Sequence, residues 1–198
     1  MEKGKQIEKW FDTDFNFNQL YPTSIQLLSG KHWTPLSVAR KAANFLAAEN
    51  DARILDIGSG VGKFCLSAGY YKPHANFFGV EQRQSLINYA ENARLLLNLE
   101  NVAFIHENFT QLDFTDYEHF YFYNAFYENL IGTFKIDESV EYSAQLFNKY
   151  NIHLFRQLEQ KPAGTRLATF HSTEYEIPSS YYEVGSEMDN LLKFWIKV

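Results

Sequence analysis

Short strand-like runs alternate with helical patterns along most of this chain, and this alternation constrains its fold more than any other feature. The runs are rich in apolar and aromatic residues and lie at residues 54–57, 75–81, 102–106, 119–124, 164–171, 181–184 and 192–198. Helical patterns, with apolar side chains on one face, lie at residues 34–49, 63–70, 86–97 and 140–160. The first helix is expected to have Thr34 as its N-cap and Pro35 as its first residue. Strands that alternate with helices predict an α/β fold with an open sheet.

The last two strand-like runs are connected differently from the others. A short turn at Gly185 and Ser186 joins them, and it cannot contain the crossover that parallel neighbours require. Residues 171–180, between the fifth and sixth runs, also leave little room for a helix. The sequence therefore predicts a mostly parallel seven-stranded sheet with helices on both faces, in which the last two strands form an antiparallel hairpin.

Composition excludes several other classes of protein. The chain has 198 residues, is 45% hydrophobic and contains one cysteine, so it can build a core and cannot form an internal disulfide. This length suits a main domain at residues 34–198, preceded by an extension at residues 1–33 whose aromatic side chains pack on it as a flap. No apolar run approaches the roughly 20 residues of a membrane span, and the N-terminus lacks a signal-peptide pattern. We therefore expect a cytoplasmic protein without a membrane partner.

Acidic residues outnumber basic ones by 24 to 18, and the excess lies in the C-terminal part of the chain. Proteins that bind nucleic acid through its phosphates usually have a stripe of basic residues, and the sequence shows none. The sequence therefore favours a small molecule or a protein as the substrate and argues against nucleic acid. The acidic part of the chain either forms a solvated surface or faces a cationic or neutral substrate. No pattern indicates an oligomeric state.

The stretch at residues 54–62 gives the clearest indication of a binding site. An expected strand is followed there by three alternating glycines, Gly58, Gly60 and Gly62, which lead into an expected helix. Glycines let the backbone approach a ligand closely, and α/β folds bind ligands at this carboxyl edge of the sheet. Glu81 ends the next strand, where its carboxylate can accept hydrogen bonds from both hydroxyls of a ribose.

The spacing of the glycines distinguishes between two classes of nucleoside ligand. A dinucleotide site has the pattern Gly-x-Gly-x-x-Gly, which aims a helix N-terminus at a pyrophosphate. Here the third glycine comes one residue early, and Asp56 lies two residues before the first. A carboxylate at that place repels a pyrophosphate and can anchor an ammonium group. The pattern therefore favours a ligand with a ribose and an amino-acid end, and it leaves a nicotinamide-dependent oxidoreductase as a disfavoured alternative.

Residues 54–62 resemble the first motif of the class I S-adenosylmethionine-dependent methyltransferases, and Glu81 resembles their acidic ribose ligand. The expected order of strands and helices is also similar to that family over roughly residues 33–198. The resemblance implies S-adenosyl-L-methionine as the cofactor. The residues that it implies for cofactor binding are Trp33, Thr34, Asp56, Gly58, Ser59, Gly60, Gly62, Glu81, Gln82, Asn108 and Phe109. The histidines are scattered without metal-ligand spacing, so no metal is expected.

The resemblance places the transferred methyl group beside the end of the fourth expected strand. The proline-containing motif of the amino-group methylases is absent there, because Ala125 and Phe126 stand in place of its prolines. The edge that begins at Asn124 is instead similar, over a few residues, to that of the non-SET histone lysine methyltransferases. Asn124 and Tyr127 are the candidate catalytic residues, the first to orient an acceptor and the second to face positive charge with its ring.

The implied activity is methyl transfer from S-adenosylmethionine to a small molecule or a protein side chain that the sequence does not identify. Alignment of the reactants in a dry site supplies much of the rate enhancement, so a general base is optional. A cofactor-binding relative without catalysis, such as a partner subunit, stays open as an alternative. Asn108 supports that alternative, because this family often has an aspartate at its position.

Overall fold

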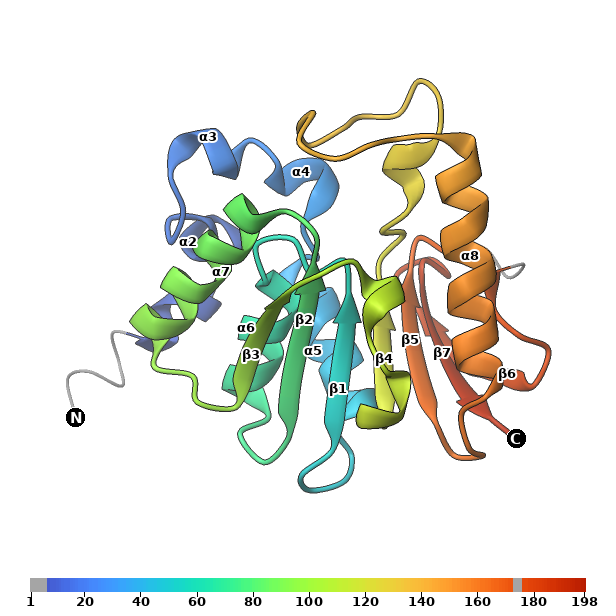
Figure 1. Ribbon diagram of the computed structural model, residues 1–198. Coiled ribbons are helices and arrows are strands. Elements are labelled where there is room, and N and C mark those ends of the chain that lie inside the picture. Colours follow the sequence, from blue (N-terminus) through green and yellow to red (C-terminus); the bar gives the residue numbers. More distant parts are fainter. Residues whose placement is uncertain (1–6, 173–175) are drawn as a thin grey trace.

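The computed structural model describes residues 7–172 and 176–198 and is built on one seven-stranded sheet (Figure 1). The strands are β1 (Arg53–Ile57), β2 (Asn76–Glu81), β3 (Val102–His106), β4 (His119–Phe122), β5 (Arg166–Phe170), β6 (Tyr181–Glu187) and β7 (Leu192–Lys197). Their order across the sheet is β3-β2-β1-β4-β5-β7-β6. The order reverses direction between β1 and β4, which pair in parallel. A ligand crevice is expected at the carboxyl ends of the strands at this point.

The predicted fold class is confirmed, including the hairpin at the end of the sheet. β7 pairs antiparallel with both β5 and β6, and the other neighbouring strands are parallel. The expected turn at Gly185 and Ser186 is wrong, because both residues pair with β7 and continue β6. Three consecutive residues with positive φ angles, Met188, Asp189 and Asn190, make the turn instead. Residues 171–180 lie partly outside the described part of the chain.

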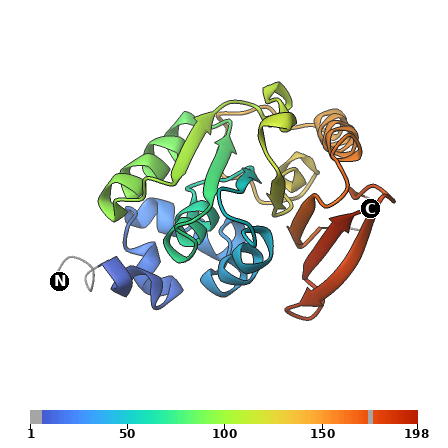
Figure 2. The same ribbon diagram turned by 90° about the horizontal axis from the view of Figure 1, so that it is seen from below.

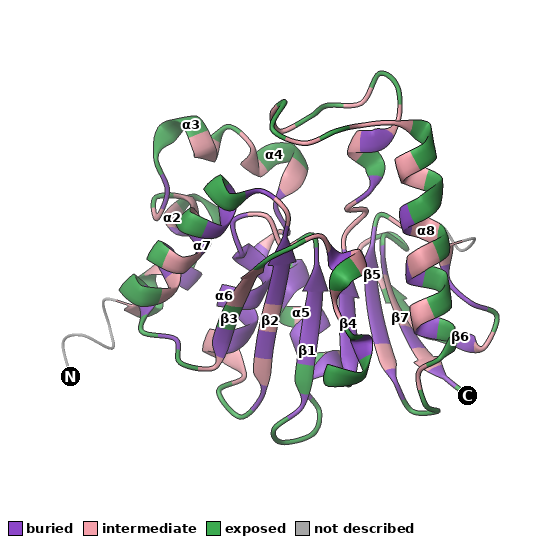
Figure 3. Cartoon of the chain, viewed as in Figure 1, coloured by how far each residue is buried: buried purple, intermediate pink, exposed green. Residues whose placement is uncertain are grey.

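Helices cover both faces of the sheet (Figure 2). On one face, α5 (Leu36–Leu46), α6 (Lys63–Tyr71) and α7 (Gln84–Leu97) contribute to one apolar cluster. On the other face, α8 (Ala144–Glu159) packs with the short turns η2 (Phe109–Gln111) and η3 (Phe114–Asp116) in a second cluster. Successive side chains of a strand point to opposite faces, so Ile54 joins the first cluster and Leu55 the second. The central strands are therefore buried on both sides (Figure 3).

The described residues before α5 form short helical segments instead of one irregular flap. These segments are η1 (Lys9–Phe11), α2 (Asp14–Asn18), α3 (Thr23–Gln26) and α4 (Ser29–His32). The aromatic side chains of Phe11, Phe17, Tyr21 and Trp33 pack into the same apolar cluster as α5 and α6. The Tyr21 hydroxyl also donates a hydrogen bond to the carbonyl of Val61 in the glycine loop, at 2.9 Å. A domain boundary at residue 33 stays a prediction.

Two helices begin later than the sequence predicts. α5 begins at Leu36, with Pro35 as its N-cap, because Thr34 makes a different contact. The side-chain oxygen of Thr34 lies 3.0 Å from the hydroxyl of Tyr121 in β4, and a hydrogen bond links the two groups. α8 begins at Ala144 instead of residue 140.

Across the described ranges, no helix has the length and apolar character needed to cross a membrane.

Candidate functional site

A cavity of about 540 Å³ lies at the carboxyl ends of the central strands. Small-molecule sites usually enclose roughly 300–1,000 Å³. The walls come from the glycine loop after β1, the end of β2, the residues after β3 and the loop that joins β4 to α8. α4 supplies residues on the opposite side of the mouth (Figure 1). The predicted site residues that line this cavity are Gly58, Gly60, Glu81, Gln82, Asn108, Phe109, Asn124 and Tyr127.

Five predicted cofactor residues lie outside the cavity wall: Trp33, Thr34, Asp56, Ser59 and Gly62. Trp33, Thr34 and Asp56 are buried in the interior instead. The structure thus brings eight of the predicted cofactor and acceptor residues to one cavity and leaves these five among the groups that support it. Direct contact between any of the five and the cofactor stays a prediction.

All three glycines of the loop after β1 have positive φ angles, of 77° at Gly58, 55° at Gly60 and 83° at Gly62. The N–H of Gly58 donates to the carbonyl of Val80 at 3.0 Å, which ties the loop to β2. A Cβ atom at Gly62 would lie 2.3 Å from the ring of Phe104, whereas one at Gly60 would meet no atom within 4 Å. Packing therefore requires Gly62, and Gly60 presents bare backbone to the cavity, as close approach to a ligand requires.

Glu81 lies at the end of β2 and faces the cavity, although its side chain is buried. Its Oε2 accepts a hydrogen bond from the N–H of Gly60 at 3.3 Å, and its Oε1 accepts one from the N–H of Arg83 at 2.9 Å. Burial raises the pKa of Glu81, and the charge of Arg83 opposes that shift. A carboxylate has about four lone-pair sites. Two are used by these N–H groups and a third by Nη1 of Arg83, which lies 3.3 Å from Oε1. Glu81 therefore keeps one acceptor site, on Oε2, for a ribose hydroxyl.

Asp56 lies in β1, behind the glycine loop, and its side chain is 3% exposed. The thiol of Cys65 is a weak donor to its Oδ2 at 3.7 Å. Burial raises the pKa of Asp56 to about 8, and the charge of Glu81 adds to the shift. An ionised carboxyl with so weak a donor is unfavourable in the interior. An ammonium group brought close to Asp56 would favour its ionised form.

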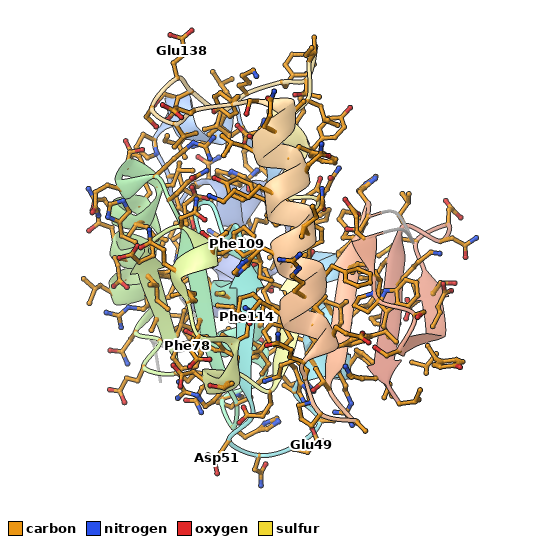
Figure 4. All side chains as sticks on the ribbon, turned by 45° about the vertical axis from the view of Figure 1, so that its right-hand side comes forward. Glu49, Asp51, Phe78, Phe109, Phe114 and Glu138 are labelled. Carbon is orange, nitrogen blue, oxygen red and sulfur yellow. The ribbon has the colours of Figure 1, made fainter. Side chains whose placement is uncertain are left out.

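Asn108 follows β3, and hydrogen bonds hold both ends of its amide. Its Oδ1 accepts from the N–H of Thr110 at 3.1 Å, and its Nδ2 donates to the hydroxyl of Tyr150 at 2.8 Å. Phe109 beside it stacks on Phe126, with 4.9 Å between ring centroids, and faces α8 (Figure 4). The role of Tyr150 cannot be predicted from sequence, because α8 brings it from 42 positions away. This wall is flat and apolar with a polar edge, which suits an adenine ring.

Asn124 and Tyr127 lie in another wall of the cavity, after β4. Asn124 has a positive φ of 40°, and its carbonyl accepts a hydrogen bond from the N–H of Tyr127 at 3.1 Å. Tyr123 and His171 line the cavity as well, with 5.8 Å between their ring centroids. Both residues directly follow the ends of central strands, Tyr123 after β4 and His171 after β5. This wall therefore combines an amide with aromatic rings.

The charged side chains that line the cavity, within the described part of the chain, are mostly acidic. Glu81, Glu107 and Glu128 are carboxylates, and Lys31 and Arg83 are cations. A site with an excess of negative charge favours a ligand that carries positive charge. The sequence does not predict a site role for Arg83 and Glu128, because isolated charged residues usually belong to a solvated surface.

A family model described as a methyltransferase domain matches residues 48–159. The chain belongs to this family. Two curated relatives, the tRNA (guanine-N(7)-)-methyltransferases of Synechococcus sp. (strain JA-3-3Ab) and Microcystis aeruginosa, are 48% and 44% identical to it over 54 residues. Those residues are 27% of this chain and 23% and 26% of the relatives. The match thus covers about a quarter of each relative's length.

Solved methyltransferase structures share the fold. The RNA methyltransferase from Salinibacter ruber in complex with S-adenosyl-L-homocysteine is 18% identical, with a TM-score of 0.58 over 83% of this chain and 93% of that one. The S-adenosylmethionine-dependent O-methyltransferase from Thermotoga maritima is 15% identical, with a TM-score of 0.56 over 89% and 72%. The predicted family, enzyme class and cofactor are confirmed at the level of the domain: the chain carries a methyltransferase domain of the S-adenosylmethionine-dependent kind.

The expectation that argues against a nucleic acid substrate is contradicted, because the curated relatives are named as tRNA methyltransferases. That expectation rested on the missing basic stripe. A basic stripe indicates that a protein binds the phosphates of a nucleic acid across its surface. A single base can also be recognised inside a pocket, by stacking and by hydrogen bonds to its edges. Net charge therefore does not decide this class of substrate.

Proposed function

We propose that this enzyme transfers the methyl group of S-adenosylmethionine to a ring nitrogen of a purine in tRNA, with N7 of guanine as the first candidate. The observation that carries the proposal is the match over 54 residues to enzymes named tRNA (guanine-N(7)-)-methyltransferases. The aromatic rings in the cavity support it, because base–aromatic stacking contributes about 1–3 kcal/mol per base.

For the cofactor, we propose that Glu81 accepts a hydrogen bond from a ribose hydroxyl and that the backbone at Gly58 and Gly60 holds the methionine part. Gln82, Asn108 and Phe109 then flank the adenine, with the Tyr150 hydroxyl as a further donor. Supporting this assignment, all of these residues line one cavity, and the Glu81 carboxylate reaches the glycine loop through a hydrogen bond. Trp33, Thr34 and Asp56 are buried, and Ser59 and Gly62 belong to the glycine loop itself.

For the acceptor, we propose that Asn124 orients the base edge through its amide and that Tyr123 and Tyr127 face the ring of the base. S-adenosylmethionine supplies a methyl group on a positively charged sulfur; the sulfur–carbon bond breaks as the nitrogen–carbon bond forms, and the positive charge passes to the base. A neutral ring nitrogen uses its own lone pair, so no residue has to remove a proton. The carboxylates of Glu107 and Glu128 line the same cavity and stabilise a cationic product.

The test is an acceptor assay with methyl-labelled S-adenosylmethionine. The purified protein is incubated separately with unmodified tRNA transcripts, a protein mixture and a metabolite mixture, and labelled nucleosides are identified by mass spectrometry. We expect a methylated purine in the tRNA, and we expect Asn124→Ala to lower its formation while S-adenosylhomocysteine still binds. Tyr182→Ala is the matched control, because Tyr182 is an exposed side chain on β6 outside the cavity wall. Label in protein or metabolite alone would refute the proposal.

A further inference from the structure

The buried side chain of Arg83 connects two parts of the cavity. One is Glu81, the carboxylate proposed to bind the ribose, and the other is the loop on the acceptor side. The side chain of Arg83 is 4% exposed. Its Nη1 lies 3.3 Å from Glu81, its Nη2 lies 2.7 Å from both Glu128 and the hydroxyl of Tyr142, and its Nε lies 3.3 Å from Asp137. The planar guanidinium has five donors in a fixed fork, so one side chain can serve four partners at once. A lysine cannot reproduce this geometry.

Three of these four partners belong to the loop at residues 124–143, which joins β4 to α8. The loop rises above the sheet before it enters α8, and Glu138 at its outer part points away from the sheet (Figures 1 and 4). Its fold is centred on Glu128, whose Oε2 also accepts hydrogen bonds from the N–H of Ile136 at 2.9 Å and from the hydroxyl of Tyr142 at 3.1 Å. Arg83 follows β2, so it links this centre to the sheet.

We propose that Arg83 is a positioning residue that couples cofactor binding at Glu81 to the order of the loop at residues 124–143, which carries Asn124 and Tyr127. The inference rests on the proposed binding of the ribose at Glu81 and does not depend on which acceptor is methylated. A ribose hydroxyl that donates to Glu81 holds its carboxylate in one orientation, and Nη1 of Arg83 lies 3.3 Å from that same carboxylate.

The same guanidinium holds Glu128, so a Glu81 carboxylate held in one orientation also orients Arg83 and favours the ordered loop. Coupling of this kind is reciprocal: an ordered loop raises cofactor affinity by the factor by which the cofactor favours the ordered loop. Bound cofactor then increases the fraction of molecules in which the acceptor wall is ordered. We therefore expect the acceptor to bind productively after the cofactor has bound.

Hydrogen–deuterium exchange measures the coupling without turnover. In the unchanged protein, saturating S-adenosylhomocysteine should slow exchange in peptides from residues 124–143 by about tenfold. In Arg83→Lys, the same ligand at saturation should leave loop exchange unchanged within about twofold, and its affinity should fall by about tenfold. Arg94→Lys is the matched control, because Arg94 pairs with Glu91 within α7 and lies outside the cavity wall. This variant should behave like the unchanged protein.

Equal loop protection in Arg83→Lys and the unchanged protein would overturn the inference. So would ligand binding without any loop protection in the unchanged protein. If Arg83→Lys does not fold, Glu128→Gln breaks the same link from the loop side and should abolish protection in the same way. Loop protection without methylation of tRNA would refute the proposed acceptor and leave the coupling supported. The absence of binding heat in the unchanged protein would overturn the coupling together with the cofactor site.

Discussion

Replacing Asp56 with asparagine should change how the stability of this protein depends on pH. Asp56 is 3% exposed, and burial raises its pKa from an ordinary value of 3.8 to about 8. The folded protein therefore holds a proton on this group over a range of pH in which the unfolded chain has released it. Asparagine has nearly the same shape and does not ionise, so it removes this difference between the two states.

The sign and the size of the effect follow from proton linkage. The free energy of unfolding decreases as pH rises wherever the folded state binds more protons than the unfolded state. The stability associated with protonated Asp56 is fully present below its ordinary pKa of 3.8 and is lost progressively up to about pH 8. Each pH unit within this window removes about 1.4 kcal/mol. A rise from about pH 5 to about pH 7 therefore costs about 3 kcal/mol through this one group.

Urea denaturation at a series of pH values measures the effect. The free energy of unfolding of Asp56→Asn, minus that of the unchanged protein, should increase by about 3 kcal/mol between about pH 5 and about pH 7. The comparison of slopes removes any constant cost of placing an amide in the interior. Asp189→Asn is the matched control, because Asp189 lies on the exposed turn between β6 and β7. A difference for Asp56→Asn that changes with pH no more than the difference for Asp189→Asn would refute the reasoning.

Three further substitutions test the glycine loop and the cavity wall. Gly62→Ala should destabilise the fold by roughly 2–5 kcal/mol, because its Cβ would meet the Phe104 ring at a positive φ, whereas Gly60→Ala has open space and should cost about 1 kcal/mol. Urea denaturation measures both, and equal costs would contradict the packing argument. Tyr150→Phe removes the acceptor for the Asn108 amide, a hydrogen bond worth about 1 kcal/mol, and should weaken S-adenosylhomocysteine binding about fivefold. Unchanged affinity by calorimetry would show that the orientation of Asn108 does not affect binding.

The strands of the sheet are predictable because burial on both faces leaves a clear pattern. β4 is buried at all four of its positions, and its sequence is almost wholly aromatic. Helix starts are less predictable, because one side chain can serve either of two partners. Thr34 is suited to cap the helix that follows it, yet its hydroxyl bonds to Tyr121, which is 87 positions away. A contact at that separation has no signature in the local sequence.

The residues of the candidate site are likewise predictable only where their roles depend on the local sequence. The glycine loop and Glu81 are readable because their roles depend on local backbone and on position at a strand end. The location of Asp56 was readable too: strand alternation puts it on the same face as Ile54, which packs in the apolar cluster with α5 and α6. Arg83, by contrast, meets Glu128 and Asp137 across 45 and 54 positions. The fold of the loop after β4 therefore cannot be predicted from sequence patterns.

The close approach of Gly58 to Ala125 limits how this enzyme could acquire a new specificity. A Cβ atom at Gly58 would lie 2.5 Å from the methyl group of Ala125, so this methyl group packs directly on the backbone of Gly58. Any larger side chain at either position would push the glycine loop and the residues after β4 apart. We therefore expect changes of acceptor preference, by natural drift or by directed evolution, to arise at other residues of the cavity wall.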